Sequence, residues 1–289
     1  MAASDSIQRA ERRPPTDKAT GSNNQFLRGI ARAFAGSLIF SLPMLMTMEM
    51  WWMGFTMSAW RIAILLVVTV PLLLGLSLFA GFRSARSICD NIADVFVAIF
   101  VAVIAAIVTL WLFGVLEASM SLREVVGKVA VQMVPGSIGA MLARSQLGES
   151  SAEDEAGSGE EPYWGELFIM AVGAIFLSFN VAPTEEMVLI AYKMSVWQEL
   201  CLALLSLLLM HAFVYSSNFK GGSSMGEEGF IRIFLRYSIV GYVTVIVVSM
   251  AILWFFGRAD GTGMEEFLSA SIVLAFPGSI GAAAARLVL

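Results

Sequence analysis

The hexapeptide Pro135-Gly136-Ser137-Ile138-Gly139-Ala140 occurs a second time in the chain, as Pro277-Gly278-Ser279-Ile280-Gly281-Ala282. Each copy is followed by an arginine four positions after its last residue, Arg144 in the first case and Arg286 in the second. This repeat indicates a tandem duplication. Each half of the chain can therefore be compared with the other, and a residue that both halves keep can be told from one that occurs once.

The composition indicates that most of this chain is embedded in a lipid bilayer. Hydrophobic residues make up 58% of the sequence and charged residues 14%, whereas soluble domains average roughly 45–50% and 25%. The apolar runs reach the length of about 20 residues with which a helix crosses about 30 Å of hydrocarbon, and exceed the roughly 10 residues of a barrel strand. The sequence therefore predicts an all-α fold, a polytopic membrane helical bundle.

Eight transmembrane helices are predicted, four in each half. They cover residues 30–53, 62–82, 93–116, 125–142, 165–190, 196–215, 230–256 and 267–287. The fourth is short and carries Lys128, but its duplicate, the eighth, is a fuller apolar run, which argues that both cross the membrane. An even number of crossings in each half gives the two repeats the same orientation.

The distribution of positive charge predicts that both termini lie inside the cell, because lysine and arginine concentrate in short cytoplasmic loops. With the N-terminus inside, the outer side holds only Arg61, Arg123, Lys128, Lys193 and Arg258. The remaining thirteen of the 18 lysines and arginines fall on the inner side.

Composition also divides the chain into four segments. Residues 1–25 are polar and predict a disordered cytoplasmic tail. Residues 26–148 form the first membrane repeat and residues 163–289 the second. Between them, residues 149–162 are rich in Glu, Gly and Ser and predict a solvated cytoplasmic linker. This linker explains most of the net charge of −5, which therefore gives no indication of a nucleic-acid partner.

One pair of acidic residues falls at matching positions of the two halves. An offset of 137 residues aligns Trp60 with Trp197 and, without a gap, Glu49 with Glu186. An acid near the middle of a membrane helix costs about 2.5 to 3.5 kcal/mol, so a retained pair invites a functional explanation. Glu49 lies near the outer interface, however, and the alternative is a carboxylate that reaches water or helps to end the span.

A proline precedes each of these glutamates, Pro43 in the first predicted span and Pro183 in the fifth. Proline interrupts the helical hydrogen-bond ladder and frees carbonyl groups. An interrupted helix followed by a carboxylate is a candidate site for a cation or a proton. Two such sites are expected to face each other across the axis that relates the repeats.

The repeated hexapeptide itself has two interpretations. Proline and two glycines near the middle of a span can break the helix and expose backbone groups to an ion or substrate. Small residues four apart, such as Gly136 with Ala140 and Gly278 with Ala282, also let two helices pack closely. Both interpretations concern the same residues: Pro135, Gly136, Ser137 and Gly139, and Pro277, Gly278, Ser279 and Gly281.

Other residues give no signature of catalysis, a cofactor or a metal site. The motifs H-E-x-x-H, G-x-x-x-x-G-K-[ST] and G-x-S-x-G are absent from the sequence. Met46, Met50, Met53 and Met57 share one face of a continuous helix, but no cysteine or histidine cluster joins them, which favours packing over copper binding. The single histidine, His211, has no counterpart in the first half and is expected to be a hydrogen-bonded helix residue.

The four-plus-four layout, the paired hexapeptides and the segments Thr47-Met48-Glu49-Met50 and Thr184-Glu185-Glu186-Met187 together resemble a bacterial family of integral membrane proteins of unknown function, over about residues 26 to 289. The resemblance implies a multi-pass protein of the bacterial cytoplasmic membrane and brings no activity. From the residues, two functions are expected: a transporter or channel for a small cation or protons with Glu49 and Glu186 as ligands, or a non-transporting membrane scaffold or sensor. The lipid bilayer is the expected partner, and the sequence leaves the oligomeric state open.

Overall fold

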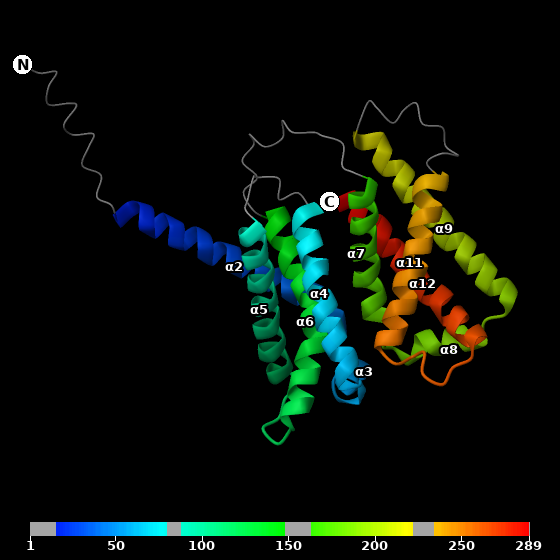
Figure 1. The fold of residues 1–289 in the computed structure, drawn as a ribbon, viewed down its shortest axis with the longest axis horizontal. Helices are drawn as coiled ribbons and strands as arrows, with labels where there is room; N and C mark the ends of the chain where they lie inside the picture. The colour runs from blue at the N-terminus through cyan, green and yellow to red at the C-terminus, as the bar shows by residue number, and fades with distance from the viewer. Residues whose placement is uncertain (1–15, 80–87, 148–162, 222–233, 289) are drawn as a thin grey trace, which may run out of the picture.

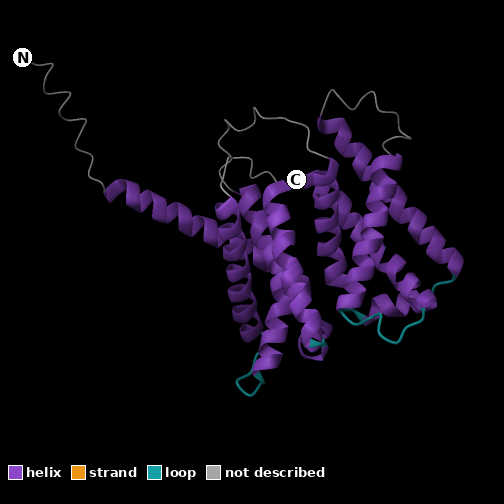
Figure 2. Ribbon diagram, viewed as in Figure 1, coloured by secondary structure: helices purple, strands orange, loops and turns teal. Residues whose placement is uncertain are grey.

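The computed structural model describes residues 16–79, 88–147, 163–221 and 234–288, and all regular structure in these ranges is helical (Figure 2). The predicted linker at 149–162 lies outside the described residues, as do residues 1–15 of the predicted tail. Residues 16–25 of that tail are helical, because the first helix begins at Thr16.

The helices follow one another along the chain as α2 (Thr16–Leu45), α3 (Met48–Thr56), α4 (Ala59–Phe79), α5 (Ile88–Leu112), α6 (Leu122–Leu147), α7 (Tyr163–Val181), α8 (Glu185–Lys193), α9 (Val196–Gly221), the π-helix η3 (Phe234–Ile239), α11 (Val240–Phe255) and α12 (Met264–Val288). The start of α2 and the end of α12 lie toward the same end of the bundle, here called the termini end (Figure 1). The short helices α3 and α8 lie at the opposite end, the α3–α8 end.

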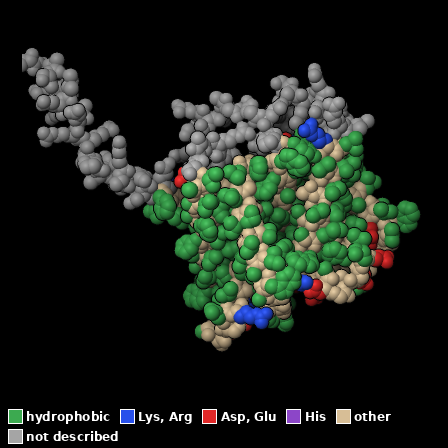
Figure 3. Space-filling view, in the orientation of Figure 1, with side chains coloured by type: hydrophobic (Ala, Val, Ile, Leu, Met, Phe, Trp, Pro, Cys, Tyr) green, Lys and Arg blue, Asp and Glu red, His purple; other side chains and the backbone are tan. Residues whose placement is uncertain are grey.

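Seven helices of the described residues are long and apolar enough to cross a membrane, and an eighth span results when residues 26–45 of α2 and α3 are counted together. Many of their apolar side chains face outward, among them Val67 at 69% exposure. On the face shown in Figure 3, hydrophobic side chains cover the middle and charged ones gather toward the ends. The prediction of an all-helical membrane bundle is confirmed.

Helix α6 is the central helix of the first half. It contacts α2, α3, α4 and α5, and residues 127–141 are buried without a gap. Lys128 is tolerated there because its Nζ donates to the carbonyl of Val115 at 3.2 Å and lies 3.0 Å from Glu124 Oε1. In the second half, α12 contacts α7, α8, α9 and α11.

The first predicted span is not one straight helix. Helix α2 ends at Leu45, and α3 starts at Met48 after a bend of 89°. The fifth predicted span likewise ends at Val181, and α8 follows as a separate helix. The break separates Met46, which is 67% exposed, from the buried Met50, Met53 and Met57, so the four methionines do not share a single helical face.

Arg61 at the start of α4 joins the two halves at the α3–α8 end. Its guanidinium donates two hydrogen bonds of 2.6 Å to the carboxylate of Asp260, in the loop between α11 and α12. The same guanidinium lies 5.4 Å from the ring centroids of both Trp60 and Trp254. A bidentate pair flanked by aromatic faces has a fixed geometry, which anchors this loop to the first half.

We predict an acid-sensitive step in stability from this ion pair. The hydrogen bond from Arg61 holds the pKa of Asp260 below its ordinary value of 3.8. A carboxylate with a lowered pKa stabilises the fold fully above the ordinary value, and this contribution is lost as the pH falls below it. The melting temperature of the purified protein should therefore drop below about pH 4, and less so for Asp260→Asn. The drop is expected to be small, because the Asp260 side chain is 60% exposed.

The exposed Glu265, on the same side of the molecule, provides the matched control. Glu265→Gln should keep the acid-sensitive step of the native chain. If Asp260→Asn keeps it as well, the ion pair does not cause it.

Candidate functional site

The two helix breaks have the same construction. Thr47 precedes α3 and Thr184 precedes α8, both with extended backbone angles. Each threonine hydroxyl donates back to the helix before it, Thr47 to the carbonyl of Pro43 and Thr184 to that of Val181 at 2.8 Å. The chain bends by 89° at the first break, and at the second α8 runs in a different direction from α7 (Figure 1).

The prolines lie beside these breaks in different ways. Pro43 is an exposed residue within α2, close to its end, whereas Pro183 is buried between α7 and α8. The carbonyl of Pro183 accepts a hydrogen bond from Nη2 of Arg258. In the second half, therefore, the break holds a charged side chain.

A cleft of about 420 Å³ opens at the α3–α8 end between the two halves. Its lining consists of Met48, Glu49, Trp52, Met53 and Thr56 from α3, Glu185 from α8, and Phe256, Gly257 and Arg258 from the turn after α11. Gly257 has a φ of +74°, which favours glycine there and turns the chain at the edge of the cleft. This cleft, named the acidic cleft below, is the candidate functional site.

The acidic cleft carries a net negative charge, with two carboxylates and one guanidinium. Glu49 is partly buried and Glu185 is exposed. Among the described residues neither carboxylate has an ion-pair partner within 4.0 Å, and the buried Nε of Arg258 has no hydrogen-bond partner. Both glutamates lie in the first turn of their helices, where the helix dipole favours a negative charge.

The structure brings Glu49 together with Glu185 and not with Glu186. Glu186 is exposed on the first turn of α8 and does not line the cleft. Successive residues of a helix point about 100° apart, so the neighbouring glutamate faces another way. The carboxylates of the two halves therefore share one asymmetric cleft instead of forming two matching sites.

Arg258 and Glu185 are the charged cleft residues that the sequence pattern did not predict as part of a site, and among the described residues Arg258 is the only cation of the cleft lining. Its signal was present, because it is one of only five positive residues predicted on the outer side and directly follows Gly257. No counterpart marks it in the first half, where the offset of 143 that pairs Gly114 with Gly257 places Val115.

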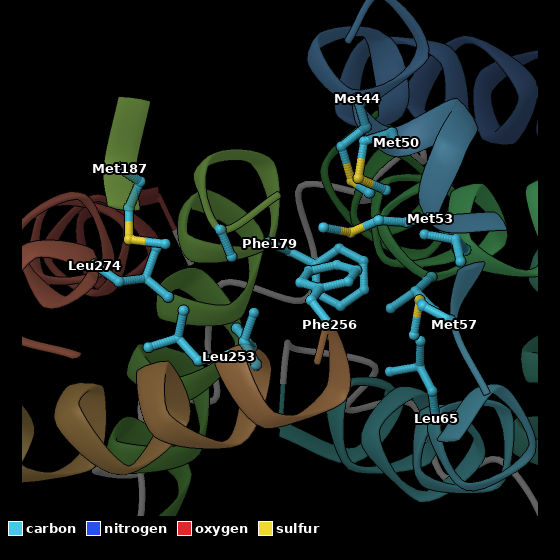
Figure 4. Close-up of a cluster of buried hydrophobic side chains, with 14 of the residues drawn as sticks. Met44, Met50, Met53, Met57, Leu65, Phe179, Met187, Leu253, Phe256 and Leu274 are labelled. Carbon is cyan, nitrogen blue, oxygen red and sulfur yellow. The ribbon is translucent and has the colours of Figure 1, made fainter. Parts of the chain in front are cut away.

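Apolar side chains close the floor of the acidic cleft. Met53 and Phe256 line the cleft and also belong to a buried cluster with Met44, Met50 and Phe179 (Figure 4). The rings of Phe179 and Phe256 lie 4.7 Å apart. The floor of the acidic cleft is therefore part of the apolar core of the bundle.

The repeated hexapeptides lie within α6 and α12, which run through Pro135 and Pro277 without interruption. Their glycines contact the first helix of the same half. A Cβ added at Gly139 would overlap the carbonyl oxygen of Gly36 in α2, and one added at Gly281 would overlap that of Gly173 in α7. The first glycines of the blocks lie against serines: a Cβ would come within 2.7 Å of Ser37 Oγ at Gly136 and 2.6 Å of Ser178 Oγ at Gly278.

The serines of the blocks hydrogen-bond within their own helices, Ser137 to the carbonyl of Val134 at 2.9 Å and Ser279 to that of Ala275 at 2.7 Å. These contacts are those of close helix packing, and the blocks do not reach the acidic cleft. Nδ1 of His211 lies 2.8 Å from Ser238 Oγ, so the ring is held between two helical segments of the second half.

Fold and composition define the class of the chain, a polytopic α-helical integral membrane protein. The sequence model of the family described as "Putative integral membrane protein (DUF2391)" matches residues 29–289, and the chain belongs to this family. No curated protein and no solved structure matches the chain.

Proposed function

We propose that the protein is a transporter or channel for a small cation or for protons, and that the acidic cleft is where the ion binds on the α3–α8 side. One observation carries the proposal: helix breaks of the same construction bring a carboxylate from each half, Glu49 and Glu185, into a single cleft. Discontinuous helices that meet between two repeats are a recurrent way to build an ion site in transporters.

The chemistry of the cleft suits a small cation. Carboxylate oxygens are the ligands that hard cations prefer. Glu49 is partly enclosed by the side chains around it, and a carboxylate with limited access to water attracts a cation more strongly than a fully solvated one. Arg258 leaves one net negative charge, which favours a monovalent cation or a proton over an anion.

Passage requires the apolar floor to open. In this proposal, contact of the cleft with the apolar core at Met53 and Phe256 represents the closed state. Opening requires α3 to move about the two-residue connection at Met46 and Thr47. The break separates α3 from the long helix α2, so that α3 can shift Met53 away from Phe256 while α2 stays packed on α6. The bacterial cytoplasmic membrane with both termini inside is the proposed location, since all five outer-side positive residues then lie at or near the α3–α8 end.

The proposal is tested by ion flux in proteoliposomes that contain the native chain. H⁺, Na⁺, K⁺, Ca²⁺ and Mn²⁺ are each supplied as a gradient, with protein-free vesicles as the baseline. We expect flux of at least one of these ions above the baseline. Flux of none of them, with protein shown to be folded and inserted, would count against transport.

A second candidate is a non-transporting membrane scaffold or sensor. The continuous α6 and α12 and the apolar floor favour it, because α6 and α12 offer no helix break and residues of the apolar core line the acidic cleft. In that case the cleft is a docking surface for a cationic partner. Binding of a cation to the cleft without flux would support this candidate.

A further inference from the structure

A second hollow lies between the two halves, away from the acidic cleft. This groove has a volume of about 390 Å³ and is walled by α2 and α6 on one side and α7 and α12 on the other. Its lining includes Ala35, Gly36 and Ile39 of α2 and Gly281, Ala284 and Ala285 of α12. The residues belong to the middle of α2 and the last turns of α12, so the groove extends from mid-membrane toward the termini end.

The lining is entirely apolar in its side chains. Water in such a groove would find no hydrogen-bond partners on the side chains, so a hydrocarbon chain is the better occupant. The small residues that let the helices cross closely also create the hollow, because they leave space beside the crossing that larger side chains would fill. Ile39 is 68% exposed and Ala35 and Ala284 are exposed, so the groove is accessible from the lipid.

Two arginines precede the groove along α2. Arg28 and Arg32 share a helical face with Ala35 and Ile39, and Arg32 is about 10 Å from Ile39 along the axis. Neither arginine has an ion-pair partner among the described residues. On the opposite wall, Arg286 is paired with Glu166 at 2.8 Å, so among the described residues near the groove the arginines of α2 are the cations without an ion-pair partner.

We propose that this groove binds one acyl chain of an anionic glycerophospholipid, whose phosphate is held by Arg28 and Arg32. The apolar walls select a hydrocarbon tail and the two guanidinium groups select a negative headgroup. The site is separate from the acidic cleft and does not depend on ion transport. It assigns a binding role to the part of the interface between the halves that lies toward the termini end, away from the acidic cleft.

Native mass spectrometry of the purified protein tests the proposal. The protein is equilibrated with equimolar phosphatidylglycerol and phosphatidylcholine of the same acyl chains. We expect the native chain to retain one phosphatidylglycerol in preference to phosphatidylcholine. Ala35→Trp with Ala284→Trp should fill the groove and abolish retention, whereas Val67→Trp, at another exposed position outside the groove, should leave it unchanged.

The charge is tested separately by Arg28→Gln and Arg32→Gln. Each substitution should lower the preference for phosphatidylglycerol about fivefold, as expected for roughly 1 kcal/mol per arginine near an anionic lipid. Arg123→Gln, which removes an exposed arginine at the α3–α8 end, should not change it. Equal retention of the two lipids by the native chain, or unchanged retention in the groove variant, would overturn the proposal.

Photocrosslinking covers the case in which the double tryptophan variant does not fold. A benzophenone amino acid is placed at Ile39 or at Val67 in the otherwise native chain, in vesicles that contain both lipids. We expect crosslinks to phosphatidylglycerol to be enriched at Ile39 over Val67. Equal labelling at both positions, or a crosslink from Ile39 to a second protein chain, would show that the groove holds no selected lipid.

Discussion

Replacing Gly281 by alanine is expected to destabilise the protein by about 2 kcal/mol or more, the effect of forcing extra atoms into a packed core. The added Cβ would overlap the carbonyl oxygen of Gly173 and lie within 3.1 Å of Leu177 Cβ. Since the obstacle is backbone, two helices would have to separate to relieve it. Gly139→Ala, which meets the carbonyl of Gly36 in the same way, should act alike. The measurement is thermal unfolding of the purified protein in detergent.

Gly29→Ala is the matched control, because Gly29 also lies in a membrane-facing helix but has no atom within 4 Å of an added Cβ. That substitution should be neutral or stabilising by up to about 1 kcal/mol, the helix propensity difference between the two residues. Similar losses at positions 29 and 281 would mean that helix crossing at Gly173 and Gly281 is not the reason for the loss.

Glu49→Gln combined with Glu185→Gln is expected to reduce the proposed ion flux by about a hundredfold at ion concentrations below saturation. Loss of one charged ligand weakens binding by roughly 1.5 to 3 kcal/mol, which is about tenfold or more for each carboxylate. Glutamine keeps the shape of the side chain, so the change reports on charge. Initial rates in proteoliposomes provide the measurement, with the inserted protein quantified in each preparation.

Glu186→Gln tests whether the ion site contains Glu185, as the structure indicates, or Glu186, as the alignment of the two halves predicts. Glu186 is adjacent to Glu185 but lies outside the acidic cleft, so its substitution should change flux by less than about twofold. A larger effect from Glu186→Gln than from Glu185→Gln would contradict the role given to the cleft. If all three variants transport like the native chain, none of these carboxylates is part of an ion route.

Hydropathy predicted the membrane spans well, because the length and apolarity of a helix are properties of its own sequence. It could not predict the bend at Met46 and Thr47. That bend depends on how α3 packs against α6, where an added Cβ at Gly127 would overlap the carbonyl oxygen of Gly54. Pro43 predicted an interruption of this span before Glu49, but not that the span would divide into two helices with a bend of 89° between them.

The sequence predicted only some residues of the acidic cleft, because the others reach the cleft only through the tertiary fold. Alignment of the two halves predicted Glu49 and Glu186 as site residues, and Glu185 directly precedes Glu186. Which of the neighbouring acids enters the cleft is decided by the residue at which α8 begins, and the sequence pattern leaves this uncertain by a residue or more. The sequence could not predict Arg258 as a cleft residue, because it lies in a turn that only the tertiary fold brings to the break at Pro183.

The central position of α6 has a consequence for how the protein is made. This helix is the least apolar of the seven candidate spans, and 83% of its membrane-spanning stretch is buried inside the protein. On its own it would partition into lipid weakly, since Lys128 would keep its ion pair with Glu124 of the same helix but lose the carbonyl of Val115 in the loop before it. We therefore expect α6 to remain beside the insertion machinery until α2 and α5, made before it, enclose it. Synthesis order, N-terminal helices first, then becomes a requirement for correct insertion of the first half.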